Sequence, residues 1–330
     1  MYSAGQIVGH ELWFFDNEYQ TINSLDMNNF VMKFEKMIPE MGGVRFLFER
    51  DNYIYLVFYL QAKIVKFDKK SGEYFVFRPE FGEQGKCIMY VYAFMNQNII
   101  RVYSFYQEAI HYSFNTDNDS FEILREEFLI DDQYRARLRD DNEGVITALL
   151  HSNRIEALNN QSVILSEEIQ VTGIGNDFES IWITDKKEKR LLQLSKRTYN
   201  TIKSYVSEAF NAENVNIFST NNFLIFCNNE NNILAFFNKQ QETIAEVNLT
   251  RELFKDGKED WKKINFCIEQ EENIILLPWG LVDILVYNKK DNVVEKLIYK
   301  TKFSKNYLKD NFFWKEDDKI GLSEFLCSIK

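Results

Sequence analysis

A short apolar strand that ends in one polar residue recurs along the chain, and this repeat limits the folds that the sequence can adopt. Each copy ends in a large apolar residue followed by Asp, Asn or Ser. The seven copies are Leu25-Asp26, Phe67-Asp68, Phe114-Asn115, Leu158-Asn159, Leu194-Ser195, Phe237-Asn238 and Tyr287-Asn288. They lie 36 to 50 residues apart. The spacing predicts seven similar units rather than the two domains that length alone would suggest.

The units are expected to be sheets that are covered on both faces. The residue three before the apolar one is also apolar in six copies, as in Ile64 and Ile284, with His111 as the exception. Residues three apart in a strand point to opposite faces, so both faces need a cover. Another β-rich run precedes each copy, and a polar turn with a second apolar strand follows most of them. The sequence predicts about 28 short strands in seven four-stranded antiparallel sheets.

This unit resembles the repeats of β-propeller proteins of the quinoprotein-like and YVTN-like kinds. Phe67-Asp68-Lys69-Lys70-Ser71-Gly72-Glu73 is the copy that resembles them most, and the likeness covers roughly residues 8–300. It implies an all-β fold, a seven-bladed β-propeller of four-stranded antiparallel blades. It implies no activity.

One alternative and one extension accompany this prediction. The fourth unit, around 145–166, is the weakest, and a charged stretch precedes it, so six blades with an insertion near 126–143 is the alternative. We expect the propeller over 1–300 and a C-terminal extension over 301–330. Leu322, Phe325, Leu326 and Ile329 have helical spacing, which predicts a short helix packed on the propeller.

Charge and composition exclude several classes of partner. The 330 residues carry 39 Lys and Arg against 50 Asp and Glu, a net charge of −11. Nucleic acid is not expected, because binding to its phosphates depends on clustered Lys and Arg. The longest apolar runs, 54–60 and 274–282, are too short to span a bilayer, so no membrane is expected either.

The location that we predict is the cytoplasm. The first residues show no secretory signal pattern, and the four cysteines form no CxxC pair. Cysteines with apolar neighbours are expected to be buried, reduced thiols. We expect a monomer.

A candidate site follows from where the loops of a propeller gather. Loops between the second and third strands, and those that link blades, surround the central channel on one face. Counting back from the repeated pairs places a rim of aromatic and polar residues there: Asp16, Tyr59, Tyr106, His151, Asp185, Asn228 and Trp279. Such a rim suits a sugar, a peptide or a cationic group.

Local roles compete with this interpretation. Trp13 and Trp182 occupy matching positions in an apolar-Trp-x-x-Asp pattern, and large aromatic residues within strands usually fill space. We favour a core role for both. Asp16 and Asp185 fit either a turn-capping role or a pair of carboxylates that raise each other's pKa.

Three further segments are candidates for calcium-binding or phosphate-binding motifs, and none matches its pattern fully. Asn115-Thr116-Asp117-Asn118-Asp119-Ser120 with Glu126 partly matches a calcium loop, but Ser120 stands where Gly is required, so we favour a polar turn. Gly82–Lys86 and Gly173–Gly175 fail the phosphate-binding patterns and are interpreted as turns. His111 is expected in the core or on a flank. No metal and no cofactor are predicted.

Two functions remain open. The leading hypothesis is a non-catalytic propeller that binds a protein segment or a small polar ligand on the loop face around the central channel. The alternative is an enzyme, a hydrolase or lyase, that acts on a carbohydrate-like substrate with channel carboxylates such as Asp16 and Asp185. The sequence carries no catalytic signature that would decide between them.

Overall fold

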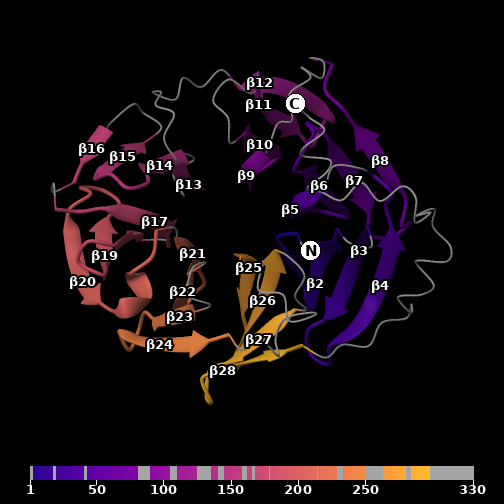
Figure 1. Ribbon diagram of the computed structural model, residues 1–330. Helices are drawn as coiled ribbons and strands as arrows, with labels where there is room; N and C mark the ends of the chain where they lie inside the picture. The colour runs from indigo at the N-terminus through magenta and orange to yellow at the C-terminus, as the bar shows by residue number, and fades with distance from the viewer. Residues whose placement is uncertain are drawn as a thin grey trace, which may run out of the picture. The chain divides into compact units, whose positions relative to one another are not determined.

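The computed structural model describes residues 3–297, except 18–19, 41–42, 81–89, 105–109, 125–134, 140–144, 158–161, 166–167, 178, 214, 229–232, 250–262 and 280–283. These residues form seven sheets, each of four antiparallel strands that follow one another in chain order (Figure 1). The chain is therefore an all-β, seven-bladed β-propeller, as the repeat predicts. The six-bladed alternative is wrong, because β13 (Arg135–Arg139) is a strand of the fourth sheet and lies within the supposed insertion.

We number the sheets blades 1 to 7 in chain order. Blade 1 has β1 (Gln6–Val8), β2 (Glu11–Asp16), β3 (Thr21–Asp26) and β4 (Val31–Met37). Blade 2 has β5 (Val44–Arg50), β6 (Tyr53–Phe58), β7 (Ile64–Asp68) and β8 (Tyr74–Phe77). Blade 3 has β9 (Tyr90–Asn96), β10 (Ile99–Ser104), β11 (His111–Asn115) and β12 (Ser120–Leu124). Blade 4 has β13, β14 (Val145–Leu149), β15 (Arg154–Ala157) and β16 (Ser162–Ile164).

The remaining blades follow the same plan. Blade 5 has β17 (Val171–Asn176), β18 (Ser180–Asp185), β19 (Arg190–Ser195) and β20 (Thr201–Val206). Blade 6 has β21 (Val215–Ser219), β22 (Phe223–Asn228), β23 (Ile233–Asn238) and β24 (Thr243–Asn248). Blade 7 has β25 (Lys263–Glu269), β26 (Asn273–Trp279), β27 (Leu285–Asn288) and β28 (Val293–Lys296). A 3-10 turn, η1 (Glu208–Phe210), links blades 5 and 6. The predicted C-terminal extension and its helix fall outside the described residues.

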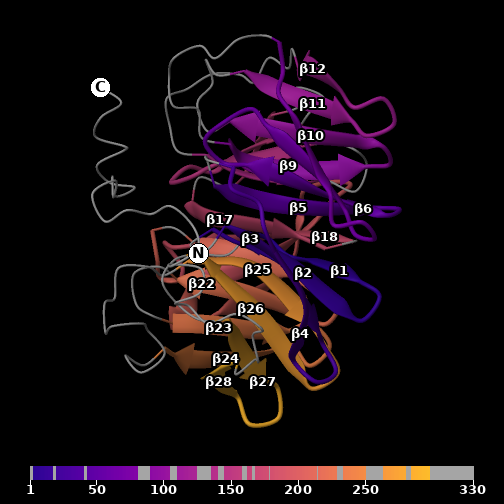
Figure 2. The same cartoon turned by 90° about the vertical axis from the view of Figure 1, so that its right-hand side faces the viewer.

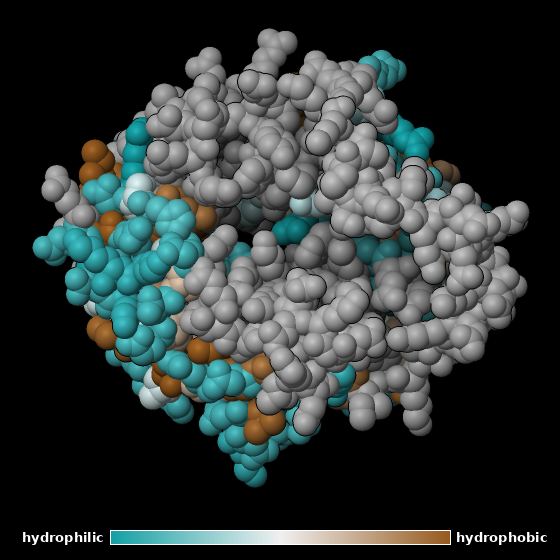
Figure 3. All heavy atoms as spheres, in the orientation of Figure 1, coloured by the Kyte–Doolittle hydropathy of each residue, from teal (hydrophilic) through white to brown (hydrophobic). Residues whose placement is uncertain are grey.

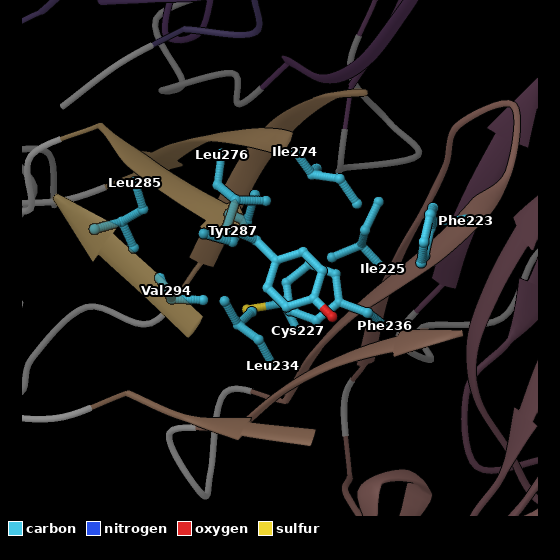
Figure 4. Close-up of a cluster of buried hydrophobic side chains, with 11 residues drawn as sticks. Phe223, Ile225, Cys227, Leu234, Phe236, Ile274, Leu276, Leu285, Tyr287 and Val294 are labelled. Atoms are coloured by element: carbon cyan, nitrogen blue, oxygen red, sulfur yellow. The ribbon is translucent and has the colours of Figure 1, made fainter. Parts of the chain in front are cut away.

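The chain divides into two compact units, one with blades 1 to 3 and one with blades 4 to 7. Within each unit the first strands of successive blades are neighbours. Blades 2 and 3 lie face to face (Figure 2), and a core of aliphatic and aromatic side chains fills the space between them. Blades 6 and 7 pack in the same way: Tyr287 stacks on Phe236 with ring centres 3.6 Å apart (Figure 4). Covering both faces of each sheet is what the apolar spacing predicts.

The polar residue of the repeat closes the turn between the third and fourth strands. Asp68 Oδ1 accepts hydrogen bonds from the backbone N–H groups of Lys70 (2.7 Å) and Ser71 (3.0 Å). Short polar side chains favour such turns because they satisfy nearby backbone donors. At the other described copies the polar side chain likewise accepts a hydrogen bond from the backbone N–H two positions later: Asp26, Asn115, Ser195, Asn238 and Asn288. We call this feature the anchor turn.

Each described anchor turn also contains one residue in the left-handed region. It stands four positions after the polar residue, with φ between 53° and 71°: Phe30, Gly72, Asp119, Tyr199, Glu242 and Asn292. The polar segment from Asn115 to Ser120 is one of these turns, as expected. Its Asp119 pairs with Lys66 at 2.9 Å and its Asp117 with Arg50 at 2.6 Å, so its carboxylates join blade 3 to blade 2.

Two glycines of β17 permit a close approach between blades 5 and 6. A Cβ atom on Gly173 would lie 2.3 Å from the Val215 carbonyl oxygen, and one on Gly175 would lie 2.6 Å from Ile217 Cγ2. No side chain fits at those distances. The interpretation of Gly173–Gly175 as a turn is therefore wrong, since both glycines belong to a strand. Gly82–Lys86 lies outside the residues that the structure describes.

A buried carboxylate joins blades 6 and 7 at their first hairpins. Glu269 accepts hydrogen bonds from Thr220 Oγ1 (2.6 Å) and the Asn222 backbone N–H (2.8 Å), and it pairs with Lys289 Nζ at 2.8 Å. Burial alone would raise the pKa of Glu269, but these partners lower it to about 2. The group is therefore ionised at every physiological pH.

Candidate functional site

The predicted site residues lie at or just after the ends of second strands. Asp16, Asp185, Asn228 and Trp279 are the last residues of β2, β18, β22 and β26, and Tyr59 and His151 follow β6 and β14. Only the backbone of Asn228 and Trp279 is described, and Tyr106 lies outside the described residues. Asp16 and Tyr59 belong to the unit of blades 1 to 3, and the other described ones to the unit of blades 4 to 7.

In the second unit, three charged or titratable side chains from blade ends meet at an exposed cluster. His151 Nδ1 lies 3.4 Å from Glu213 Oε2, and Lys186 Nζ pairs with the other oxygen of Glu213. His151 follows the second strand of blade 4, Lys186 follows that of blade 5, and Glu213 precedes blade 6. We call these three residues the loop cluster.

The backbone fixes the positions of the loop cluster. The His151 N–H donates to the Val171 carbonyl at 2.7 Å, and the Lys186 N–H donates to the Gln170 carbonyl at 3.1 Å. His151 has a φ of +64°, which is uncommon for a residue other than glycine and indicates that its surroundings impose the conformation. An imidazole and an ammonium group on one carboxylate offer both donors and an acceptor to a polar ligand.

Asp185 does not belong to the loop cluster, but it stabilises the turn from which Lys186 extends. Its carboxylate is fully buried and accepts hydrogen bonds from the Gln170 and Lys187 N–H groups at 2.9 and 3.2 Å. Arg190 Nε completes the arrangement at 2.8 Å. Of the two roles left open for Asp185, the geometry matches the turn-capping one. The capped turn holds the backbone from which Lys186 extends.

The two tryptophans are core residues, as we favoured. Trp13 packs between blades 1 and 2, and Trp182 packs between blades 5 and 6. Trp182 Nε1 also donates to Asp177 Oδ2 at 2.8 Å. His111 is buried as well, and its Nδ1 accepts a hydrogen bond from the Ser104 N–H at 3.0 Å.

Blade 1 holds a pair of carboxylates that the sequence did not indicate. Burial, followed by the charge of Asp16, raises the pKa of Glu35 to about 7. Asp16 is buried too, and Glu35 Oε2 has no hydrogen-bond partner among the described residues. Two buried like charges cannot both ionise easily, so this pair can hold a proton near neutral pH.

Tyr59 lies at a similar strand end in blade 2, beside a cation. The Arg45 guanidinium stands 5.4 Å from the centre of its ring. Nearby in sequence, the buried Lys63 lies over the Phe58 ring at 4.0 Å and pairs with Glu40 at 3.0 Å. Burial lowers the pKa of Lys63, although its hydrogen bond with Glu40 opposes this. Cation–π contacts of this kind fix the cations in place.

Sequence reasoning missed Glu213, Glu35 and Lys63. Glu213 stands in a blade-linking loop, a kind of loop that was expected at the site, so counting back from the next blade would have found it. Glu35 and Lys63 gave no signal, because each becomes unusual only through burial by distant residues.

Among the described residues, no group of three or more His, Cys, Asp or Glu side chains is arranged to hold a metal ion. The part of the chain that the structure covers has no helix able to cross a membrane.

No family model and no curated protein matches the sequence. Solved structures do match in fold. Streptogramin B lyase is 15% identical with a TM-score of 0.60, over 84% of this chain and 90% of that one. Hsv2 from Kluyveromyces marxianus is 10% identical with a TM-score of 0.56, over 90% and 98%.

A third match is PorZ from Porphyromonas gingivalis, a surface component of the type-IX secretion system. It is 9% identical with a TM-score of 0.58, over 92% of this chain and 38% of PorZ. A lyase, Hsv2 and a secretion-system component are thus all similar to this chain in fold. Because fold does not imply function, the similarity bears on the architecture alone.

Proposed function

We propose that the chain is a non-catalytic binding module that takes a small polar ligand or a protein segment at the ends of its second strands. The loop cluster is the observation that carries this proposal. His151, Lys186 and Glu213 come from three successive blades, and all three reach solvent. Exposed polar groups that converge from separate loops on a rigid scaffold are typical of binding sites.

The proposed ligand carries an acceptor for Lys186 and His151 and a donor for Glu213. A carboxylate with a neighbouring hydroxyl or amide group meets both needs, as in hydroxy acids, acidic sugars and peptide termini. Nucleic acid and membranes are not part of the proposal. We place the chain in the cytoplasm; support comes from Cys227 and Cys267, which share one core between blades 6 and 7 without a disulfide bond. We also propose that the chain is a monomer.

Thermal-shift screening of hydroxy acids, acidic sugars and short peptides, followed by calorimetry, tests the proposal. A ligand of this site should bind Lys186→Ala at least tenfold more weakly than the wild type. Lys290→Ala, an exposed lysine in the anchor turn of blade 7, is the matched control and should bind equally well. Equal affinity of all three proteins for every ligand found would exclude the loop cluster as the site.

The enzyme alternative is favoured by one observation, the raised pKa of Glu35 beside Asp16. A carboxyl group with a pKa of about 7 can act as a general acid while its neighbour stays ionised. In this alternative, a hydrolase or lyase acts on a carbohydrate-like substrate, and the acid pair is Asp16 and Glu35 rather than Asp16 and Asp185. Turnover of a glycoside or uronide panel that disappears in Glu35→Gln supports it; turnover that persists in Glu35→Gln and Asp16→Asn rules it out.

A further inference from the structure

The outer strand of blade 5 is covered on one side only. Tyr205 of β20 packs against Trp182 and Phe237 in the core toward blade 6. On the same strand Ile202 and Val206 are 53% and 75% exposed. In blade 6 the matching strand β24 is covered on both sides, because Ile244 packs toward blade 5 and Val247 toward blade 7. β20 therefore departs from the pattern of its neighbour.

The short outer strands of blade 4 explain this difference. β15 has four residues and β16 three, whereas β19 and β20 have six each. Among its described residues, blade 4 supplies Val163 and Leu165 to the outer part of the core that it shares with blade 5. Within the described residues β20 pairs with β19 alone, as the fourth strand of each sheet pairs with one neighbour, so its outer edge has backbone N–H and C=O groups that no described strand uses. An edge of this kind can accept a further strand.

The segment that flanks this edge is rich in Lys and Arg, although carboxylates outside the segment pair with four of these seven residues. Residues 186–203 contain seven Lys or Arg and one acidic residue, within a chain of net charge −11. Several of these cations have acidic partners: Lys189 pairs with Glu208, Arg190 with Asp185 and Lys203 with Glu242. Lys187 and Arg197 are exposed and form no ion pair within the described part of the chain.

The two unbalanced cations lie at opposite ends of β20. Arg190 is the register partner of Val206, so the turn with Lys187 is at the Val206 end. Leu194 is the register partner of Thr201, so the anchor turn with Arg197 is at the other end. The surface thus combines a free strand edge, an exposed branched side chain near each end, and a cation beyond each. In Figure 3 the left part of the molecule, where Figure 1 places β20, is hydrophilic with separate hydrophobic patches.

We propose that the β20 edge binds an extended acidic segment of another protein by strand addition. The backbone of the segment pairs with β20, its apolar residues contact Ile202 and Val206, and its carboxylates face Lys187 and Arg197. A second copy of this chain is disfavoured as the occupant, because pairing β20 with itself would bring these cations together. A lipid surface has no backbone with which to use the strand edge. The proposal involves no residue of the loop cluster.

Fluorescence anisotropy with a labelled eight-residue peptide tests this proposal. In the probe, Val alternates with Asp or Glu; one reference peptide has Lys in place of the acids, and another has two central Pro residues that prevent strand pairing. The wild type should bind the acidic probe at least tenfold more tightly than either reference peptide. The affinity should fall as salt rises from 0.1 to 0.5 M.

Variants locate the binding. The double variant Ile202→Asp/Val206→Asp and the double variant Lys187→Glu/Arg197→Glu should each bind the acidic probe at least tenfold more weakly. Val293→Asp, at a 44% exposed position on the outer strand of blade 7, is the matched control and should bind normally. If the first variant melts early, the charge variant decides, since its residues are exposed in turns. Equal binding of all three peptides, equal loss in Val293→Asp, or binding only to phosphatidylserine vesicles would overturn the proposal.

Discussion

The two ends of blade 5 differ in how they use polar residues. At the anchor turn, Ser195 caps the backbone as its counterparts do in five other blades. At the opposite end, the buried Asp185 pairs with Arg190, and Lys186 reaches across to the Glu213 side chain before blade 6. At the matching place in blade 1, Asn17 also reaches the next blade, but it bonds only with the Val44 backbone. Repetition therefore marks what every blade needs in order to fold. The site that we propose for binding lies where the chain departs from the repeat.

The largest loss of stability should come from a substitution at a position that the packing of blade 5 requires. Gly173→Ala should lower the free energy of unfolding by about 3 kcal/mol, because the new Cβ meets the Val215 carbonyl, which cannot move aside. Urea denaturation measures it. Gly9→Ala is the control: nothing lies within 4 Å of the added Cβ, and the positive φ of Gly9, which Gly173 lacks, gives an expected loss of about 1 kcal/mol. Equal losses would mean that the close approach of β17 to β21 is unimportant.

A smaller loss should follow from Glu269→Gln, at the contact between blades 6 and 7. The folded pKa of about 2 lies below the ordinary 4.5, so the charged group stabilises the fold above pH 4.5. That stability is lost as the pH falls toward 2. We expect the variant to be about 2 kcal/mol less stable at pH 7, allowing for solvent screening. Melting curves from pH 7 to pH 2 should converge with those of the wild type; a constant difference contradicts this cause.

The smallest effect should come from a single anchor turn. Asn238→Ala removes the side-chain oxygen that accepts hydrogen bonds from the Gln240 and Gln241 N–H groups, both at 3.0 Å. We expect a loss of about 1 kcal/mol by urea denaturation, because both donors remain accessible to water. Asn248→Ala, at the exposed end of β24, should change nothing measurable. If both variants lose the same stability, the repeated polar residue has no special role.

The sequence predicted the parts of this molecule that depend on local chemistry. Asp68 and Asn288 could be recognised because the turn that each closes involves residues no more than four positions away. The pair Gly173 and Gly175 was misinterpreted because the reason for those glycines is a strand about 40 residues later. Glu35 escaped notice for the same reason, since only folding brings a second carboxylate near it.

The candidate site was predicted by position more than by identity. Counting along the repeat located His151 at a blade end, and the structure adds its neighbours Lys186 and Glu213. The same count placed Asp185 at the corresponding end of blade 5, but Asp185 is buried and the next residue, Lys186, is the one that reaches solvent. A repeat fixes the place of each loop, but the direction of each side chain depends on hydrogen bonds that no spacing reveals.

The missing side chains of Gly173 and Gly175 have a consequence for ligand capture. Backbones in direct contact cannot slide past each other without colliding, so the hairpin that carries Lys186 and the blade-linking loop that carries Glu213 keep a constant separation. A receptor whose groups are already in place loses little freedom when it is filled. In the binding role that we propose, two methyl groups absent from the interior would therefore raise the affinity of the loop cluster for its ligand.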